Sequence, residues 1–451
     1  MAQDGRRTDA FGILDASGFQ IGRIQPLSHS LIGTKALSSA HRESVVQLLG
    51  CCGPAAALWL DGLPGHDALY QGFLQNEGSL VRLRTLLTEA PSLLEAYASP
   101  NLTKILLTGG ADPSADSEER LHELPTTCSL NQLAESFAVG WYGACLTWLI
   151  APDFDLGHKL SALVDVLLVH CARRLYVDFD VIALGSYGRR ELAPLSGIEL
   201  LLLVPSEALH QQAESQAADM LALLEMLKRL GAPISVDFQL RPDGARGPFA
   251  RTYEGFLAYE LEGMEMLERF AIGMSRGVLG SEEAPALVQR VAYAIPLTPE
   301  RLRELLEGKR RKETERLKPQ YRRRDVKFGE GSLTDLEWFV HLMELRYPTA
   351  SRAGEHHEME ERIRALARAG LINAIEKEEL IQARRYLLDL RNRLVLMGNS
   401  HGILPENPDK LEQLAPSVGA KDANDLLLRH HRITRTVRNI FIEGMEGLKA
   451  W

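Results

Sequence analysis

Gly185 and Ser186 directly follow a short apolar run, and they are the first residues of this sequence whose types and spacing could do chemistry. The run, residues 181–184, has the composition of a strand, and the turn Gly-Ser-Tyr-Gly begins where it ends. Backbone N–H groups in a turn without a Cβ are open to an approaching anion, so this turn could hold a phosphate. Tight turns also use these residues for geometry alone, and both interpretations stay open.

Two carboxylates, Glu199 and Asp237, lie in the β-rich runs that follow, residues 198–204 and 234–240. Alternate residues of a strand face the same side, so positions 197 and 199 share a face on which Asp237 of a later strand can converge. Position 197 is glycine, which leaves two carboxylates at this face. The alternatives are that Glu199 is an exposed strand-end carboxylate and that Asp237 is a buried acid paired with an arginine.

Arg241 extends the polar face of the third run. Asp237, Gln239 and Arg241 alternate there with apolar residues, which is the pattern of a half-buried strand with one polar face. Arg241 could bind a phosphate through two hydrogen bonds, or it could form a salt bridge with Asp237.

Helices must position these strands. Apolar residues at three- and four-residue spacing predict helices within residues 68–98 and 130–174, and a further helix lies near 209–230. From Pro299 onward nearly all of the chain is predicted to be helical. Two strands joined by a turn, then a long helix and a third strand, fit a small mixed sheet. We therefore predict an α+β fold, with a small mixed-sheet domain inside a mostly helical protein that ends in a helical bundle. The predicted core stripe of that bundle is Trp338, Phe339, Leu342 and Leu345.

The composition excludes several classes of protein. With 451 residues, 45% apolar and 25% charged, the chain can bury the cores of two or three domains and is not disordered as a whole. A formal charge of −9 argues against a general nucleic-acid binder. The stretch from Arg301 to Lys327 nevertheless carries twelve Lys or Arg against five Asp or Glu. It could face a polyphosphate or an acidic partner, or it could be a solvated helix face.

Cysteines and histidines do not suggest a zinc site. The five cysteines form no CxxC pair, so we expect reduced thiols. The histidine pairs at 356–357 and 430–431 are predicted to lie at the surface. The longest apolar stretch, residues 160–172, contains Asp165 and His170, so we expect no membrane span and a cytoplasmic protein.

Four segments follow one another in a characteristic order. They are VIALGSYGRRELAPLSGIELLLLV, ISVDFQLRPDG with the later MEMLERFA, DVKFGEGSLTDLEWF, and RRYLLDLRNRLVLMGNSHGILPENPDKL. Together they resemble the glutamine synthetase adenylyltransferase/adenylyl-removing enzyme family over roughly residues 69–441, a length that suits one of the two modules of that enzyme. The part GSYGRREL is also similar to PII uridylyltransferase.

The resemblance implies a nucleotidyltransferase domain of the DNA polymerase β type. We expect that domain in residues 176–296, after a segment of unknown role (1–65) and a helical region (66–175) and before a helical domain (297–451). In such enzymes a Ser-Asp-x-Asp strand start and a third Asp hold the magnesium ions that carry the nucleotide phosphates. Catalytic and metal-binding roles are thereby implied for Glu199 and Asp237. Nucleotide contacts are implied for Gly185, Ser186, Arg241 and Lys327. The matching polar motif of the helical domain is Asp325, Asp335 and Glu337.

Several residues depart from the family pattern. Gly197 stands in place of a carboxylate, and Gln239 and Thr334 stand in place of arginines. Ser332 and His341 also differ from the glycine and glutamine that the resemblance predicts. Losing one metal ligand could slow the chemistry by roughly 10²- to 10⁴-fold. Glu191 could reach in as a surrogate ligand, although the family has its own use for a glutamate there.

These departures favour a degenerate relative, weak or inactive in nucleotidyl transfer, that acts by binding a protein or a nucleotide. Its Mg²⁺ site would be weak or lost, with ATP as a possible ligand and glutamine synthetase or another protein as a possible partner. The alternative is an active, magnesium-dependent enzyme that adenylylates or de-adenylylates glutamine synthetase through Glu199 and Asp237. Neither hypothesis involves nucleic acid or a membrane.

Overall fold

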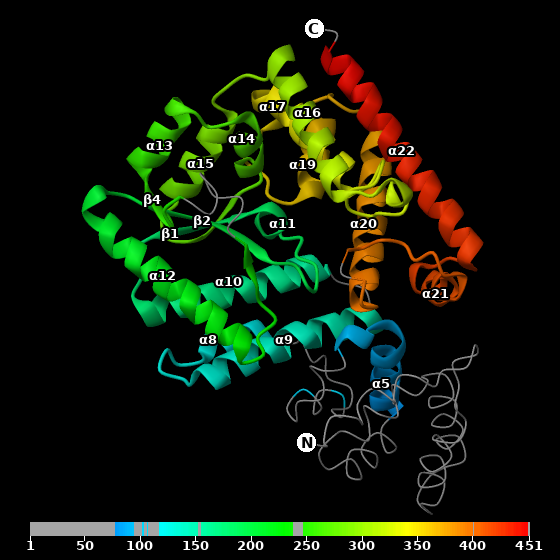
Figure 1. Cartoon of the computed structure of the whole chain (residues 1–451), viewed down its shortest axis with the longest axis horizontal. Helices are drawn as coiled ribbons and strands as arrows, with labels where there is room; N and C mark the ends of the chain where they lie inside the picture. The colour runs from blue at the N-terminus through cyan, green and yellow to red at the C-terminus, as the bar shows by residue number, and fades with distance from the viewer. Residues whose placement is uncertain are drawn as a thin grey trace, which may run out of the picture.

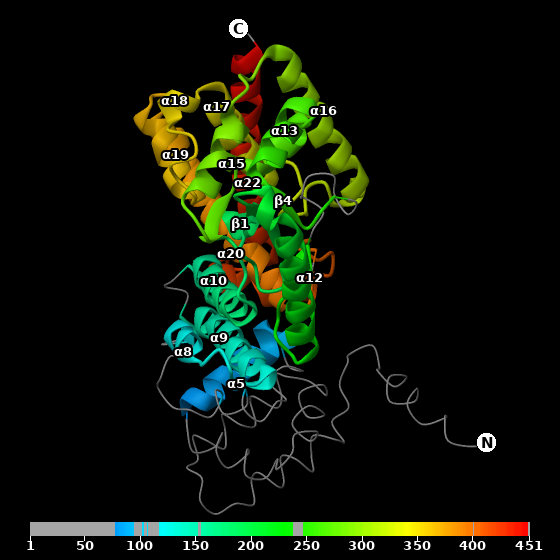
Figure 2. The same cartoon turned by 90° about the vertical axis from the view of Figure 1, so that its left-hand side faces the viewer.

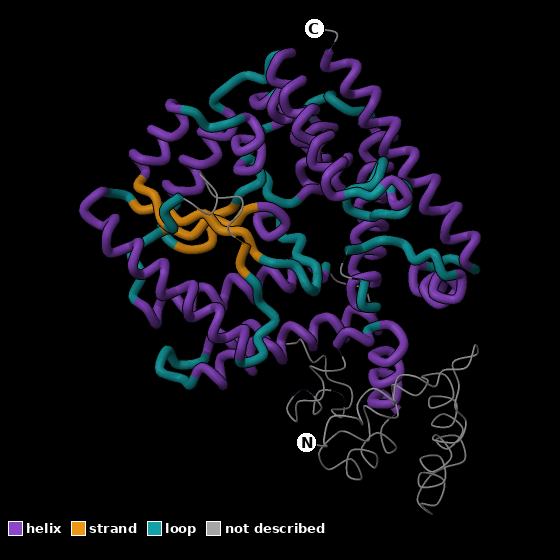
Figure 3. The backbone as a smooth tube through the Cα atoms, viewed as in Figure 1, coloured by secondary structure: helices purple, strands orange, loops and turns teal. Residues whose placement is uncertain are grey.

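The described part of this computed structural model is mostly helical and encloses one small sheet (Figures 1 and 3). It comprises residues 77–93, 102, 106, 117–151, 155–237, 247–399 and 401–449. The predicted α+β fold is confirmed. The segment 1–65 and the predicted residues Gln239 and Arg241 lie outside the described residues.

The sheet is mixed, as predicted. Its strands are β1 (Asp180–Leu184), β2 (Ile198–Val204), β3 (Val236–Asp237), β4 (Ala250–Thr252) and β5 (Arg276–Leu279). The order is β3-β2-β1-β5, and β4 also pairs with β2. β1 runs antiparallel to β2 and β5, whereas β3 and β4 run parallel to β2. The two short strands β4 and β5 were not predicted.

Helices cover both faces of this sheet (Figures 1 and 2). Alternate strand residues face opposite sides, and here both sides are apolar. Ala183 and Leu200 join a core with α8 (Ser117–Glu123), α9 (Leu130–Ile150), α10 (Leu156–Leu175) and α12 (Glu207–Arg229). Ile182 and Leu201 join a second core with α13 (Tyr253–Glu262), α14 (Met266–Ile272) and α15 (Glu283–Tyr293). The strands are therefore buried on both faces.

The helix α9 is long and apolar enough by composition to cross a membrane. In this fold 67% of its most apolar window is buried. A capping box at Ser129 and Gln132 begins it, and Phe137, Trp141 and Leu146 are inside the core. Its burial is that of a core helix.

The C-terminal helices form the predicted bundle. Its central helix is α17 (Leu333–Arg346), where the stripe Trp338, Phe339, Leu342 and Leu345 is buried as predicted. The other elements are α16 (Pro299–Arg316), η3 (Pro319–Tyr321), α18 (Pro348–Ser351), α19 (Met359–Arg368), α20 (Ala374–Leu396), α21 (Pro408–Leu414), η4 (Ala415–Val418) and α22 (Ala423–Lys449). Near the start of the described chain, α5 (Glu77–Glu89) and η1 (Pro91–Leu93) pack beside α9 and α20.

The prediction of a surface position for His430 is wrong. Its side chain is 3% exposed on α22, and burial lowers its pKa to about 4. Leu426, His430 and Thr434 follow one another at four-residue spacing on the inner face of the helix. His431, one residue further round, is exposed as predicted. Both His356 and His357 are only half-exposed.

A buried ion cluster ties the sheet to the bundle. Glu191, in the connection between β1 and β2, accepts hydrogen bonds from Arg384 Nε (2.9 Å) and Nη2 (2.7 Å) of α20 and from Arg189 Nε (3.0 Å). Arg189 Nη2 in turn donates to Glu337 of α17 over 2.7 Å. Burial alone would raise the pKa of Glu191, but the charges of Arg384 and Arg189 outweigh it and hold that pKa below its ordinary value. Glu191 is thus a structural anion between two arginines, which leaves it unsuited to act as a surrogate metal ligand.

We expect the isosteric change Glu191→Gln to destabilise the fold by about 3–5 kcal/mol, because it leaves two buried arginines without their shared counter-ion. Urea unfolding followed by circular dichroism measures this. The control is Glu225→Gln on the exposed face of α12, which should stay within about 0.5 kcal/mol of the parent. Equal stability of the Glu191 variant and the parent would contradict a role for this cluster in holding the fold.

Candidate functional site

A cavity of about 420 Å³ lies between the sheet and the C-terminal bundle. The sheet side contributes Gly185, Ser186, Gly197 and Glu199, while helices α14, α16, α17 and α20 close the other sides. Four of the predicted site residues, Gly185, Ser186, Glu199 and Lys327, therefore line one cavity, together with Glu337 of the helical motif.

The turn after β1 is built so that only glycine fits. Gly185 has φ +57°, and it begins the one-turn helix α11 (Gly185–Gly188). A Cβ on Gly185 would lie 1.8 Å from Oε2 of Glu199. A Cβ on Gly188 would lie 2.3 Å from the carbonyl oxygen of Met274. The Glu199 carboxylate therefore rests directly against the glycine turn.

The strand register brings the two predicted carboxylate positions together. β2 and β3 pair in parallel so that Glu199 is the partner of Asp237, as the period of two predicts. The side chain of Asp237 lies outside the described part of the structure. Within the described part of the chain, no group of three His, Cys, Asp or Glu side chains could hold a metal ion. Magnesium prefers six oxygen ligands, so Gly197 and a single described carboxylate do not fit it well.

Cations dominate the opposite wall of the cavity. Lys312, Lys327 and Arg391 line it, and none of the three forms an ion pair with a carboxylate in the described residues. Burial and, to a smaller extent, the charge of Arg391 lower the pKa of Lys327 to about 8, against smaller opposing effects of Glu337 and Glu199. Burial also lowers the pKa of Arg391, whose guanidinium donates only to Ser196 Oγ over 3.4 Å. Desolvation and the neighbouring Arg316 lower the pKa of Lys312. Positive charge that lacks a protein counter-ion is the electrostatic condition for binding an anion.

The helical motif divides into residues of the cavity and residues behind it. Asp325 Oδ1 accepts from the backbone N–H groups of Lys327 (2.8 Å) and Phe328 (2.7 Å), and thereby shapes the loop that carries Lys327. Thr334 Oγ1 donates to the Lys327 carbonyl oxygen over 2.6 Å. Burial raises the pKa of Asp325, although those two backbone hydrogen bonds oppose the rise. Asp325 is therefore a positioning residue.

Asp335 is also structural. It is buried and accepts from Lys309 Nζ (2.5 Å), from Arg438 Nη1 (2.8 Å) and from the Gly331 N–H (2.7 Å), so it joins α16, α17 and α22. His341, one of the departures from the family pattern, is buried against Glu344 and Arg362 and does not line the cavity.

Sequence reasoning missed Lys312 and Arg391 as site residues. Lys312 belongs to the basic stretch that we expected to face a polyphosphate or an acidic partner. Arg391 lies in the fourth resembling segment, on a helix whose inward face the sequence alone does not specify. The basic stretch was the sign from which Lys312 could have been predicted. The sequence contained no such sign for Arg391.

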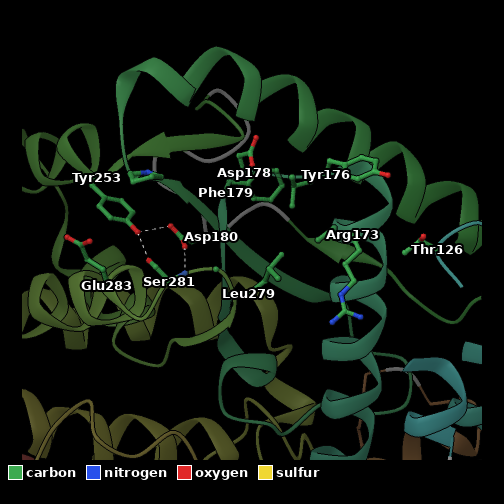
Figure 4. Close-up of a pocket in the computed structure, with 14 residues that line it drawn as sticks. Thr126, Arg173, Tyr176, Asp178, Phe179, Asp180, Tyr253, Leu279, Ser281 and Glu283 are labelled. Carbon is green, nitrogen blue, oxygen red and sulfur yellow. Dashed lines mark hydrogen bonds between the residues drawn. The ribbon is translucent and has the colours of Figure 1, made fainter. Parts of the chain in front are cut away.

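A larger hollow of about 640 Å³ lies at the opposite end of β1 (Figure 4). Three of its polar residues are paired with one another, since Tyr253 donates to Asp180 Oδ2 over 2.7 Å and the Ser281 N–H donates to Asp180 Oδ1 over 2.6 Å. Burial raises the pKa of Tyr253 to about 12, so this phenol stays neutral. The hollow contains neither the glycine turn nor the free cations, and we assign the functional site to the smaller cavity.

Two family models match the chain. The model for glutamate-ammonia ligase adenylyltransferase matches residues 160–291, and the model for GlnD PII-uridylyltransferase matches residues 301–443. The first match contains the glycine turn and the carboxylate strand, whereas the second contains Lys312, Lys327 and Arg391. The cavity therefore lies between the two matched regions.

Curated relatives agree with these matches. The bifunctional glutamine synthetase adenylyltransferase/adenylyl-removing enzyme of Leifsonia xyli is 28% identical over 318 residues, which are 65% of this chain and 31% of that protein. The Mycobacterium avium enzyme of the same name is 30% identical over 58% of this chain and 28% of its own length. The Bifidobacterium longum enzyme is 28% identical over 68% of this chain and 32% of its own length.

The chain thus spans about a third of the length of the curated relatives it matches. The fold, the glycine turn and both family models support a relation to the nucleotidyltransferases. The chain is similar to the glutamine synthetase adenylyltransferase/adenylyl-removing enzyme family over residues 160–291 and to PII uridylyltransferase over residues 301–443.

Proposed function

We propose that this protein binds a nucleotide, with ATP as the first candidate, in the cavity between the sheet and the bundle, and that it transfers the nucleotidyl group weakly or not at all. One observation carries this proposal. Gly197 leaves Glu199 as the single described carboxylate at the sheet edge, and no carboxylate among the described residues forms an ion pair with Lys312, Lys327 or Arg391. The cavity has kept the charges for phosphate binding and has lost much of the donor set for magnesium.

Binding follows from electrostatics. Lys327 and Arg391 are partly withdrawn from water and repel one another, and an entering polyphosphate relieves that repulsion. The exposed backbone of the Gly185 turn adds hydrogen-bond donors to an anion.

We expect weak transfer because the cavity offers few ligands for divalent ions. In-line nucleotidyl transfer depends on divalent ions that neutralise the phosphate oxygens and activate the attacking oxygen. Glu199 and Asp237 remain as possible ligands, so the active, magnesium-dependent enzyme is the competing proposal. A further positive group is missing at position 334, where the family has arginine. Thr334 stands there and donates to the carbonyl oxygen of Lys327.

The proposed partner is suggested by the names of the relatives. Those matched here are named for their action on glutamine synthetase. We propose that this protein acts on the same process in the cytoplasm, by binding glutamine synthetase or another protein in a manner that depends on the bound nucleotide. Because the chain matches only about a third of those enzymes, a role as regulator is as consistent with the matches as a role as catalyst.

Neutralising the unpaired cations should weaken ATP binding. We expect Lys327→Gln and Arg391→Gln each to raise the dissociation constant for ATP by roughly tenfold, since each removes about 1–2 kcal/mol of charge-assisted hydrogen bonding. Isothermal titration calorimetry measures this. Lys410→Gln, an exposed lysine on α21, is the matched control and should bind as the parent does. Parent-like binding by both cavity variants would contradict the proposed location.

Binding should also depend on pH through Lys327. The pKa of this lysine is lowered to about 8 in the free protein, so its charge is present below that pH and is lost as the pH rises through it. ATP affinity should therefore fall above pH 8, by at most about tenfold per pH unit. Lys327→Arg keeps its charge and should show a flat profile between pH 7 and 9. A parent profile as flat as that of the arginine variant would show that Lys327 does not contact the ligand.

Restoring the carboxylates should restore a response to magnesium. The parent should transfer little or no AMP from ATP to glutamine synthetase, whereas Gly197→Asp combined with Glu199→Asp should gain magnesium-dependent ATP binding and measurable transfer. Gly197 is outside the set of residues with positive φ, so its backbone accepts a side chain. Robust transfer by the parent, abolished by Asp237→Ala, would instead establish the active enzyme.

A further inference from the structure

We propose that the Glu199 carboxylate occupies a phosphate position of the cavity, so that polyphosphate binds without magnesium and in competition with this side chain. The inference rests on the proposed nucleotide binding and reverses the role that the family gives to this position. Glu199 would be a resident anion that holds the cations in place, and the ligand would replace it.

The position of the carboxylate is the first support. Its Oε2 lies so close to Gly185 that a Cβ there would be 1.8 Å away. The glycine turn is the part of the cavity where backbone N–H groups are open to an anion. Among the described side chains, the carboxylate that lies against that turn is that of Glu199.

The charges around Glu199 are the second support. Its negative charge is among those that raise the pKa of both Lys327 and Lys312, which places it within electrostatic reach of two cations on the opposite wall. It also lies in the same cavity as Arg391. The charge of Glu199 thus partly balances those of Lys327 and Lys312.

The donor set is the third support. A metal ligand should have further carboxylates beside it, but position 197 on the same strand face is glycine, and the other described carboxylates that line the cavity are Glu313 and Glu337. Glu313 pairs with Lys309, and Glu337 accepts from Arg189 over 2.7 Å. Both are already used by cations of the protein, so neither is available to complete an octahedral shell with Glu199.

Cations can take over what a metal would otherwise supply in binding. A nucleoside triphosphate has several negative charges, and magnesium normally screens them. Lys312, Lys327 and Arg391 supply three positive charges to the same volume. Once a phosphate enters, the Glu199 carboxylate is a like charge beside it and opposes binding.

The test compares the parent with Glu199→Gln, a change that keeps the shape and removes the charge. Calorimetry with ATP and, separately, with inorganic tripolyphosphate is carried out in EDTA and in excess magnesium. We expect the parent to bind ATP in EDTA, and the variant to bind both probes roughly tenfold more tightly there. Glu225→Gln, which removes an exposed carboxylate of α12, should leave both affinities unchanged. Equal melting temperatures of the three proteins verify the fold.

The outcomes separate this inference from the function on which it rests. If the parent binds ATP only with magnesium, and Glu199→Gln weakens that binding, Glu199 is a metal ligand, and the inference is overturned while nucleotide binding stands. If only the variant binds, the carboxylate excludes the ligand, and both nucleotide binding by the native protein and the inference that rests on it are overturned. If neither protein binds under any condition, both proposals fall.

Discussion

The buried ion cluster around Glu191 is the contact on which the geometry of this protein depends. It joins the connection between β1 and β2 to α20 through Arg384, and to α17 through Arg189 and Glu337. Desolvating such charges is costly, and the arrangement persists because each carboxylate oxygen accepts from a guanidinium. The cavity is the space left between elements that this cluster holds at a set separation. Its walls come from segments that are far apart in the sequence, the glycine turn at Gly185 and the cations up to Arg391, and the cluster fixes how these segments lie relative to one another.

The buried carboxylates that hold the fold together differ from the cations that line the cavity. Glu191, Asp335 and Glu344 are carboxylates that are buried and consumed by arginine or lysine. For Glu344, burial alone would raise the pKa, yet Arg362 and His341 hold it at about 2. Lys312, Lys327 and Arg391 differ because no described carboxylate pairs with them. Positive charges that line one cavity without an ion pair to a described carboxylate are a surplus that a ligand can neutralise.

The sequence predicts those features that depend on local patterns. Strands β1 and β2 are long apolar runs, and the period of two places Glu199 beside Asp237, as the register confirms. Strands β4 and β5 have only three and four residues, and they become strands by pairing with β2 and β1, which no local pattern records. The glycine turn and Lys327 could be named from motifs, whereas Arg391 could not, because its role depends on which side of α20 meets the sheet. His430 was misplaced because two adjacent helical residues differ by about 100° in direction, and the pair alone does not say which one faces inward.

Helix α20 has a mechanical consequence for the cavity. Its 23 residues form a rod about 35 Å long. One end is held by α5 and η1, where Arg393 pairs with Glu89 over 3.1 Å and Ser92 Oγ donates to the Leu396 carbonyl oxygen over 2.7 Å. Arg384 and Arg391 lie on the same rod. A helix transmits an axial displacement with little compression. A shift imposed on α5 would therefore move Arg391 by a similar distance. The first described helix of the chain is thereby mechanically coupled to a positive charge of the cavity.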